Sequence, residues 1–275
     1  MRLLAIADLH ASHPPNRAAI EALRPHPDDW LMLAGDLGDR PEQIEAVFAL
    51  LAERFARVIW APGNHDLWSL PTGAGNLRGE ALYAHLVALA RRHGVRTPED
   101  PYEVFEHPSG PVLIAPLFLL YDYSFRPAHV PLEGVIAWAR ETANVCADER
   151  YLHPDPHPTR AAWCAERVRL TAERLETRAP ALPTVLLNHY PLKQAHAVLP
   201  AAPRFTPWCG ATLTEDWHRR FDARAVVHGH LHIRKTRWTD GVPFQEVSLG
   251  YPRQWDQALG IEAYLREVRL AAPRL

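Results

Sequence analysis

The chain has 275 residues, 47% of them hydrophobic, and a formal net charge of −2 at pH 7. This length and apolar content are enough to bury a substantial core, and we expect a single domain over residues 1–275. Because the chain is nearly neutral and carries no long run of Lys and Arg, its composition argues against a protein that binds long nucleic acid and fits a small anionic substrate better.

Short apolar runs along the chain predict strands that are buried on both faces. They cover residues 3–7, 30–34, 58–61, 112–115, 184–187 and 225–227. Apolar residues at helical spacing between these runs predict helices over residues 41–55, 79–93 and 159–175. The alternation of strand and helix in the first third favours parallel strands, with functional loops at their carboxyl ends.

Two later regions do not follow this alternation. Residues 231–239 and 242–249, separated by Asp240-Gly241, predict a β-hairpin. Residues 117–158 form an irregular insertion rich in aromatic residues, Pro and His, and such a stretch is usually either a functional loop or a disordered segment. Two mixed sheets packed face to face, with helices outside, would accommodate both halves of the chain.

The N-terminus and the cysteines bear on the compartment in which the protein works. The N-terminal apolar stretch is too short for a secretory signal, and no segment approaches the roughly 18 apolar residues of a membrane span. We therefore expect a cytoplasmic protein without a membrane partner. Cys146, Cys164 and Cys209 are odd in number and widely spaced, so they predict neither a disulfide framework nor a thiolate zinc site. The sequence leaves the oligomeric state open.

Short blocks of metal-binding residues follow the predicted strands in one order. They are Asp8-Leu9-His10, Gly35-Asp36, Gly63-Asn64-His65-Asp66, Asn188-His189 and Gly229-His230-Leu231-His232. Because side chains two apart on a strand share a face, we expect Asp8 and His10 to point the same way, as well as His230 and His232. Carboxylate and imidazole ligands suit manganese, iron or zinc better than magnesium.

Together with Asp39 and Arg40, these blocks resemble the motifs of the calcineurin-like metallophosphoesterase superfamily. The superfamily pattern runs Asp-x-His, Gly-Asp-x-x-Asp, Gly-Asn-His-Asp/Glu, a lone His, then Gly-His-x-His, and here it spans residues 8–232. The resemblance implies a four-layer αββα sandwich, an α/β fold of two packed mixed β-sheets flanked by helices. It also implies a hydrolase in which a hydroxide bridging two divalent metal ions attacks a phosphomonoester or phosphodiester.

The resemblance further implies a ligand set for two ions, with manganese favoured and iron or zinc as alternatives. It assigns one ion to Asp8, His10 and His232, the other to Asn64, His189 and His230, and both to Asp36. Two divalent ions would carry about two more positive charges than the two carboxylates offset, and this surplus favours a hydroxide and a phosphoryl group.

Three further residues are candidates for catalysis by the same resemblance. His65 is expected to be the general acid that protonates the leaving-group oxygen, with Asp39 as the carboxylate that tunes it. Asp66 is expected to fix the loop. Arg40 stands where Ser/Thr phosphatases of this superfamily carry an Arg that grips phosphate, although Pro41 follows it here and a Gly follows there.

Each block alone also has an ordinary interpretation, such as a loop cap at Asp8 or a core histidine at His189. The order and completeness of the set favour the two-metal site. We interpret His228 as a packed or supporting histidine, and residues 153–157 as a proline-rich surface loop. Candidates for substrate contact, for which a solvated surface role is equally reasonable, are His196, Arg126, Tyr251 and Arg253.

The leading hypothesis is a metal-dependent phosphoesterase that acts on a small phosphate ester or nucleotide. One alternative is a metal-binding interaction or scaffold protein on the same fold, since a ligand set does not guarantee turnover. Another is a single-strand nuclease, which would need a basic or aromatic channel. The intact His65 favours the enzyme, because a protein that no longer catalyses has no need of the acid.

Overall fold

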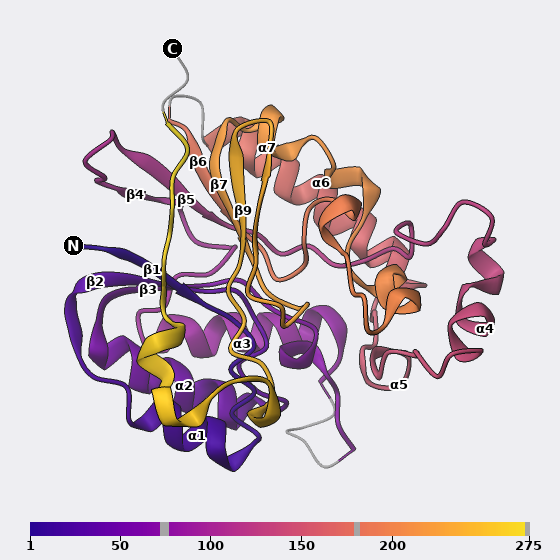
Figure 1. Ribbon diagram of the computed structural model, residues 1–275, viewed down its shortest axis with the longest axis horizontal. Helices are drawn as coiled ribbons and strands as arrows, with labels where there is room; N and C mark the ends of the chain where they lie inside the picture. Colours follow the sequence, from indigo (N-terminus) through magenta and orange to yellow (C-terminus); the bar gives the residue numbers. More distant parts are fainter. Residues whose placement is uncertain (72–76, 179–181, 273–275) are drawn as a thin grey trace.

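The computed structural model describes residues 1–71, 77–178 and 182–272, and it is built around two β-sheets (Figure 1). The first sheet has four strands in the order β10-β1-β2-β3. Strands β1, β2 and β3 run parallel, and β10 pairs antiparallel with β1 at the edge. The bounds are β1 (Leu3–Ile6), β2 (His26–Leu33), β3 (Phe55–Trp60) and β10 (Arg266–Glu267).

The second sheet has six strands in the order β4-β5-β6-β7-β9-β8. Its four inner strands are parallel, and β4 and β8 close the two edges as antiparallel strands. The bounds are β4 (Glu103–Phe105), β5 (Val112–Pro116), β6 (Thr184–Leu187), β7 (Ala223–His228), β8 (Thr236–Thr239) and β9 (Val242–Glu246). Both sheets are therefore mixed, as predicted.

Helices cover the outer face of each sheet. On the four-stranded sheet lie α1 (Pro14–Glu21), α2 (Pro41–Arg54) and α3 (Gly79–Arg92), and on the six-stranded sheet lie α6 (Arg160–Arg178) and α7 (Trp217–Arg220). A separate apolar cluster fills the space between the sheets, with alternate residues of β1 and β2 facing those of β5, β6 and β7. The predicted four-layer αββα sandwich is confirmed.

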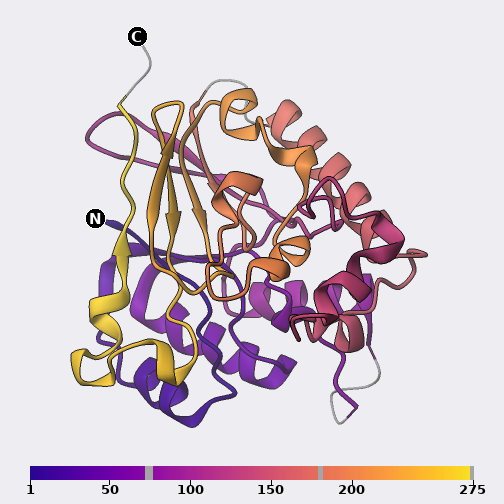
Figure 2. The ribbon, with the colours of Figure 1, turned by 45° about the vertical axis from the view of Figure 1, so that its right-hand side comes forward.

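The irregular insertion at residues 117–158 flanks the sandwich, on the side away from β10 (Figures 1 and 2). Its first residues are buried, and two short helices follow, α4 (Val135–Arg140) and α5 (Asp148–Tyr151). Backbone bonds attach its end to the rest of the chain: Ser69 N–H donates to Tyr151 O and Glu80 N–H to Asp155 O, both at 2.9 Å. The insertion is thus fastened to the segment that follows β3.

Several predicted element bounds are wrong, such as the start of β3 and the end of β9, and the starts of β2 and β8 differ most. Strand β2 begins at His26 rather than residue 30, because His26 pairs with Phe55 before the register shifts and regular pairing resumes at Trp30. Strand β8 begins at Thr236 rather than residue 231, because His232 and Arg234 adopt positive φ angles of 55° and 47°, which end the extended conformation. No helix within the described ranges is both long and apolar enough to cross a membrane.

Candidate functional site

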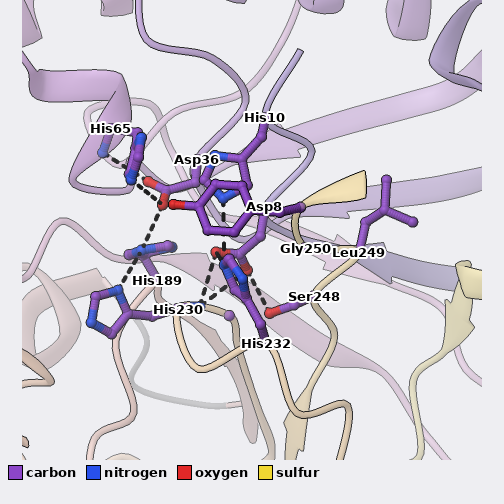
Figure 3. Close-up of polar contacts among 12 residues, drawn as sticks. Asp8, His10, Asp36, His65, His189, His230, His232, Ser248, Leu249 and Gly250 are labelled. Carbon is purple, nitrogen blue, oxygen red and sulfur yellow. Dashed lines mark hydrogen bonds and ion pairs between the residues drawn. The ribbon is translucent and has the colours of Figure 1, made fainter. Parts of the chain in front are cut away.

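The five sequence blocks meet where the parallel strands of both sheets end (Figure 3). Asp8 follows β1, Asp36 follows β2 and Asn64 follows β3 in the four-stranded sheet, while His189 follows β6 and His230 follows β7 in the six-stranded sheet. Because strands in parallel sheets share one carboxyl edge, residues more than 200 positions apart become neighbours.

The backbone at these blocks is not extended, so the expectation that strand alternation aims the side chains is wrong. The φ angles of Asp8, His10, His230 and His232 are 55°, 42°, 71° and 55°, all in the left-handed region. Such angles cost non-glycine residues about 1–3 kcal/mol each and persist where the surroundings hold them. The Asp8 N–H donates to the Gly35 carbonyl at 2.9 Å, and the His230 N–H donates to Asp8 Oδ2 at 3.0 Å.

One group of potential ligands consists of Asp8, His10 and His232. Asp8 Oδ1 lies 2.9 Å from His232 Nε2, and His10 Nε2 lies 3.4 Å from the same nitrogen. One donor atom from each residue fits within 4.8 Å of the other two. His232 lies 222 positions after His10 and 224 after Asp8 in sequence, so the fold alone brings it to them.

A second group centres on His189, whose Nε2 faces three donor atoms. They are Asn64 Oδ1 at 3.0 Å, His230 Nδ1 at 3.2 Å and Asp36 Oδ2 at 3.5 Å. Donor atoms of Asp8, Asp36 and His189 also lie within 4.8 Å of one another. Asp36 therefore stands between the two groups, where one carboxylate can reach both.

The protonation of the site suits cations. Burial lowers the pKa of His10, His189 and His230, which leaves their imidazoles neutral with lone pairs available. Burial and then the charges of Asp8 and Asp66 raise the pKa of Asp36. The site therefore holds uncharged imidazole nitrogens that face one another and a carboxyl group whose ionisation is unfavourable. A divalent cation would coordinate the nitrogens and stabilise the ionised carboxylate.

Glycines leave the room that these carboxylates need. A Cβ on Gly63 would collide with Asp36 Oδ1, and a Cβ on Gly229 would collide with Asp8 Oδ2. Neither carboxylate could keep its place beside any larger residue.

His65 lies at the edge of the same cluster and is bonded on its far side. Its Nδ1 is 2.8 Å from Asp39 Oδ1, and its Nε2 points into the site, 3.9 Å from Asp36 Oδ2. Burial raises the pKa of Asp39, but the hydrogen bond and charge of His65 outweigh it, so this carboxyl ionises below its ordinary range. The ring of Trp68 covers His65 at a centroid distance of 3.6 Å.

Asp66 joins the second block to the third rather than facing the cluster. Its carboxylate accepts the backbone N–H groups of Asp36, Leu37 and Gly63 at 3.1, 2.7 and 2.9 Å, and the indole N–H of Trp60 at 3.2 Å. Burial raises its pKa to about 6, although those donors oppose the shift. The loop-fixing role expected for Asp66 agrees with these contacts.

Several residues at the site carry no sequence signal. Gln254 Oε1 accepts from His232 Nδ1 at 2.7 Å, the Ser248 hydroxyl donates to Asp8 Oδ2 at 2.6 Å, and Asp148 Oδ1 accepts from Asn64 Nδ2 at 2.9 Å. None belongs to the five blocks, and each arrives through folding of the C-terminal segment or the insertion. An alignment of relatives would be the signal that finds them.

The residues considered for substrate contact separate into two sets. The Tyr251 ring stacks on His10 at 4.4 Å, so it lies at the site. Arg126 instead bonds the carbonyls of Val130 and Tyr123, and buried His196 pairs with Thr239. His228 is buried and bonds the carbonyl of its neighbour Gly229, as expected of a packed histidine.

A pocket of about 310 Å³ opens next to Asp39, on the His65 side of the cluster. Guanidinium groups are the main charges on its wall, since Asp39 is the one acidic residue among the described residues that line it and already bonds His65. Most of the remaining lining side chains are apolar or aromatic. The lining includes Arg40, Arg78, Arg150, His153, Trp68 and Tyr151.

Comparison with known proteins agrees with this geometry. The family model for calcineurin-like phosphoesterases matches residues 1–234. The chain belongs to the calcineurin-like phosphoesterase family. It is therefore a metal-dependent phosphoester hydrolase, rather than the scaffold protein held as an alternative, and the family implies divalent metal ions as its cofactors.

A curated relative and a solved structure are similar to this chain over most of its length. The [acyl-carrier-protein] phosphodiesterase PptH of Mycobacterium tuberculosis (strain ATCC 25618 / H37Rv) is 49% identical over 256 residues, which are 92% of this chain and 79% of the relative. The crystal structure of phosphopantetheinyl hydrolase (PptH) from Mycobacterium tuberculosis superposes with a TM-score of 0.92 at 46% identity, covering 97% of this chain and 95% of that one.

Proposed function

We propose that this enzyme hydrolyses the phosphodiester that joins a phosphopantetheinyl group to an acyl carrier protein. The observation that carries this proposal is the combination of 49% identity with a protein named for that reaction and a TM-score of 0.92 with a structure of the same name. The substrate would then be a protein-linked phosphodiester rather than the free small ester expected from composition, and rather than single-stranded nucleic acid.

The seven residues that meet at the strand ends would hold two divalent cations, with manganese favoured and iron or zinc as alternatives. Asp8, His10 and His232 form one ligand group, Asn64, His189 and His230 the other, and Asp36 belongs to both. When bound, the cations would lower the pKa of coordinated water and neutralise charge on the phosphoryl oxygens.

His65 is the general acid in this proposal. Asp39 accepts a hydrogen bond from His65 Nδ1, so the proton available for transfer is the one on Nε2, which points toward the ligand cluster. The pKa of Asp39 lies below its ordinary range, so its carboxylate can hold the Nδ1–H of His65 while the ring gives the Nε2 proton to a departing alkoxide. The alcohol that leaves would be a hydroxyl side chain of the carrier protein.

The basic pocket supports this direction of cleavage. It lies on the His65 side, where the leaving group must be, and Arg40, Arg78 and Arg150 line it. We propose that these guanidinium groups face the carrier protein around the ester and that Arg40, which lines the pocket together with Asp39, helps to hold the phosphoryl group. Charge complementarity of this kind chiefly sets the rate and specificity of encounter.

The direct test is mass spectrometry of a carrier protein that bears the phosphopantetheinyl group, incubated with manganese-loaded enzyme. The proposal predicts loss of the whole phosphopantetheinyl group, with a free hydroxyl left on the carrier protein. Turnover of simple aryl phosphates with no release from the carrier protein would contradict the substrate while leaving the hydrolase class intact. Release of dephosphorylated pantetheine would contradict the proposed leaving group.

A further inference from the structure

We infer that Asp148, from the short helix α5 of the insertion, is a positioning residue that sets the geometry of both the metal ligand Asn64 and the acid His65. The inference rests on the roles proposed for those two residues. It assigns a task to the irregular stretch at residues 117–158, which contributes no ligand of its own to the cluster. The carboxylate of Asp148 is fully buried, with 0% of the residue exposed.

One oxygen of Asp148 accepts two hydrogen bonds. Asn64 Nδ2 donates to Oδ1 at 2.9 Å, and the indole Nε1 of Trp68 donates to the same atom at 2.7 Å. These donors belong to different parts of the site, since Asn64 faces His189 and Trp68 covers His65. A single acceptor atom therefore connects a ligand with the wall behind the acid.

The first bond fixes which end of the Asn64 amide faces the cations. A carboxylate only accepts hydrogen bonds, so Asp148 selects the NH₂ end of Asn64 and turns its Oδ1 toward His189 Nε2, 3.0 Å away. An amide oxygen binds a cation, whereas an amide NH₂ group repels one. Without Asp148, no other acceptor in the described ranges would hold the NH₂ end of this side chain and so distinguish the two orientations.

The second bond fixes the indole of Trp68 against His65. The ring centroids are 3.6 Å apart and the planes are inclined at 31°. His65 is thus held at Nδ1 by Asp39 and across its face by Trp68, while its Nε2 keeps its direction into the site. Loss of the acceptor would free Trp68 and with it the ring that it restrains.

The helix that presents Asp148 is itself anchored. Arg160 donates to the Asp148 backbone carbonyl at 2.7 Å and to Glu149 Oε2 at 3.0 Å, and Trp208 Nε1 donates to Glu149 Oε1 at 2.9 Å. These contacts allow a four-residue helix to hold its side chain in one place. Precision of this kind is what a group that orients a ligand requires.

Asp148 is not explained as a contribution to stability. A buried carboxylate costs free energy unless a cationic partner compensates it, and among the described residues no Lys, Arg or His forms an ion pair with Asp148. Its second oxygen, Oδ2, is buried and accepts no N–H or hydroxyl in that part of the chain, and the neighbouring Cys146 thiol is only a weak donor to this carboxyl group. Retention of so costly a group is expected where a site depends on it.

The test compares Asp148→Ala with Asp148→Asn. Metal-free protein is titrated with Mn²⁺, and affinity and stoichiometry are measured by calorimetry, with no substrate present. Supporting contacts of this kind typically contribute about 10–100-fold to metal affinity or activity, and we expect a loss of that size in Asp148→Ala. Asp148→Asn keeps an oxygen that can accept both bonds and should recover most of the affinity.

Asp100→Ala is the matched control. Asp100 is also a buried carboxylate, 8% exposed, and its hydrogen bonds go to Thr97 and Arg91, neither of which touches the cluster. We expect this variant to lower the melting temperature while keeping the Mn²⁺ affinity of the unmodified enzyme. If Asp148→Ala is too unstable to purify, Asp148→Leu takes its place, because it also removes the acceptor but keeps more of the side-chain volume, and it should show the same loss of Mn²⁺ affinity relative to Asp148→Asn.

Three outcomes would overturn it. They are Mn²⁺ affinity in Asp148→Ala equal to that of the unmodified enzyme, equal losses in Asp148→Ala and Asp148→Asn, and losses in Asp100→Ala that match those in Asp148→Ala. Trp68→Phe, which keeps a ring but removes the N–H, should keep Mn²⁺ affinity and lower kcat more than it changes KM. Because metal binding is measured without substrate, an enzyme with a different natural ester would leave this inference standing.

Discussion

Replacement of His65 by Ala is the perturbation that separates the acid from the rest of the site. His65 Nδ1 lies 2.8 Å from Asp39 Oδ1, and Nε2 is directed at the ligand cluster, so the variant removes the proton donor without removing a proposed ligand. General acid catalysis contributes about 10²–10⁴-fold to rate, which corresponds to roughly 3–5 kcal/mol of transition-state free energy. We expect a kcat loss of that size on the protein-linked phosphodiester.

The assay compares two leaving groups on the same variant. The leaving group of an aryl phosphodiester is a stable phenolate that needs little protonation. The kcat of His65→Ala on this substrate should therefore fall by at most about tenfold. Metal content is measured in parallel, and it should equal that of the unmodified enzyme. Equal losses on the aryl and protein-linked esters would refute the assignment of His65 as acid, because a donor of protons must matter more for the poorer leaving group.

Three further outcomes follow from contacts away from the reacting atoms. Asp66→Ala removes the acceptor of three backbone N–H groups and one indole N–H, and since each buried donor left unpaired costs about 1–3 kcal/mol, chemical denaturation should show at least 3 kcal/mol of destabilisation; a change under about 1 kcal/mol would contradict this. His196 is 4% exposed, and burial lowers its pKa to about 4, so as pH falls from about 6.5 to about 4 the unfolded chain binds a proton that the folded chain does not. The free energy of unfolding therefore decreases in that window, by about 2 kcal/mol between pH 7 and pH 5. Urea unfolding of His196→Gln should show a pH dependence weaker by that amount. Reversal of the pocket charges in Arg78→Glu with Arg150→Glu should raise KM for the carrier-protein substrate by about tenfold and affect an aryl diester far less, and steady-state kinetics with equal effects on both substrates would rule out a docking role.

The fold and the convergence of the blocks could be predicted from the sequence because both follow from where the parallel strands lie and where they end. Apolar runs located the parallel strands, and the carboxyl ends of such strands share an edge, which brought Asp8, Asp36 and Asn64 together with His189 and His230. The hydrophobic pattern defined strand interiors well and strand bounds less well. At β2 the residues after His26 are polar and do not predict a strand, but His26 pairs with Phe55 of the neighbouring strand β3.

The remaining features depend on contacts between distant segments, which hydrophobic patterns do not encode. The left-handed backbone at His230 is held by a hydrogen bond from its N–H to Asp8, and the imidazole of His232 is held by Gln254; periodicity cannot connect these residues. Asp148 is a single acidic residue in an aromatic stretch, and its value at the site arises only when the insertion docks on the segment after β3. The strand argument for side-chain direction failed for the same reason.

The location of two cations tests the account most directly. Crystals of the enzyme grown with Mn²⁺ would be measured at the manganese absorption edge, where anomalous scattering identifies each ion. We predict two anomalous peaks roughly 3.5–4 Å apart, with Asp36 contacting both and Asn64 contacting one through Oδ1. A single peak, or peaks outside the cluster of Asp8, Asp36, Asn64 and His189, would contradict the proposed centre.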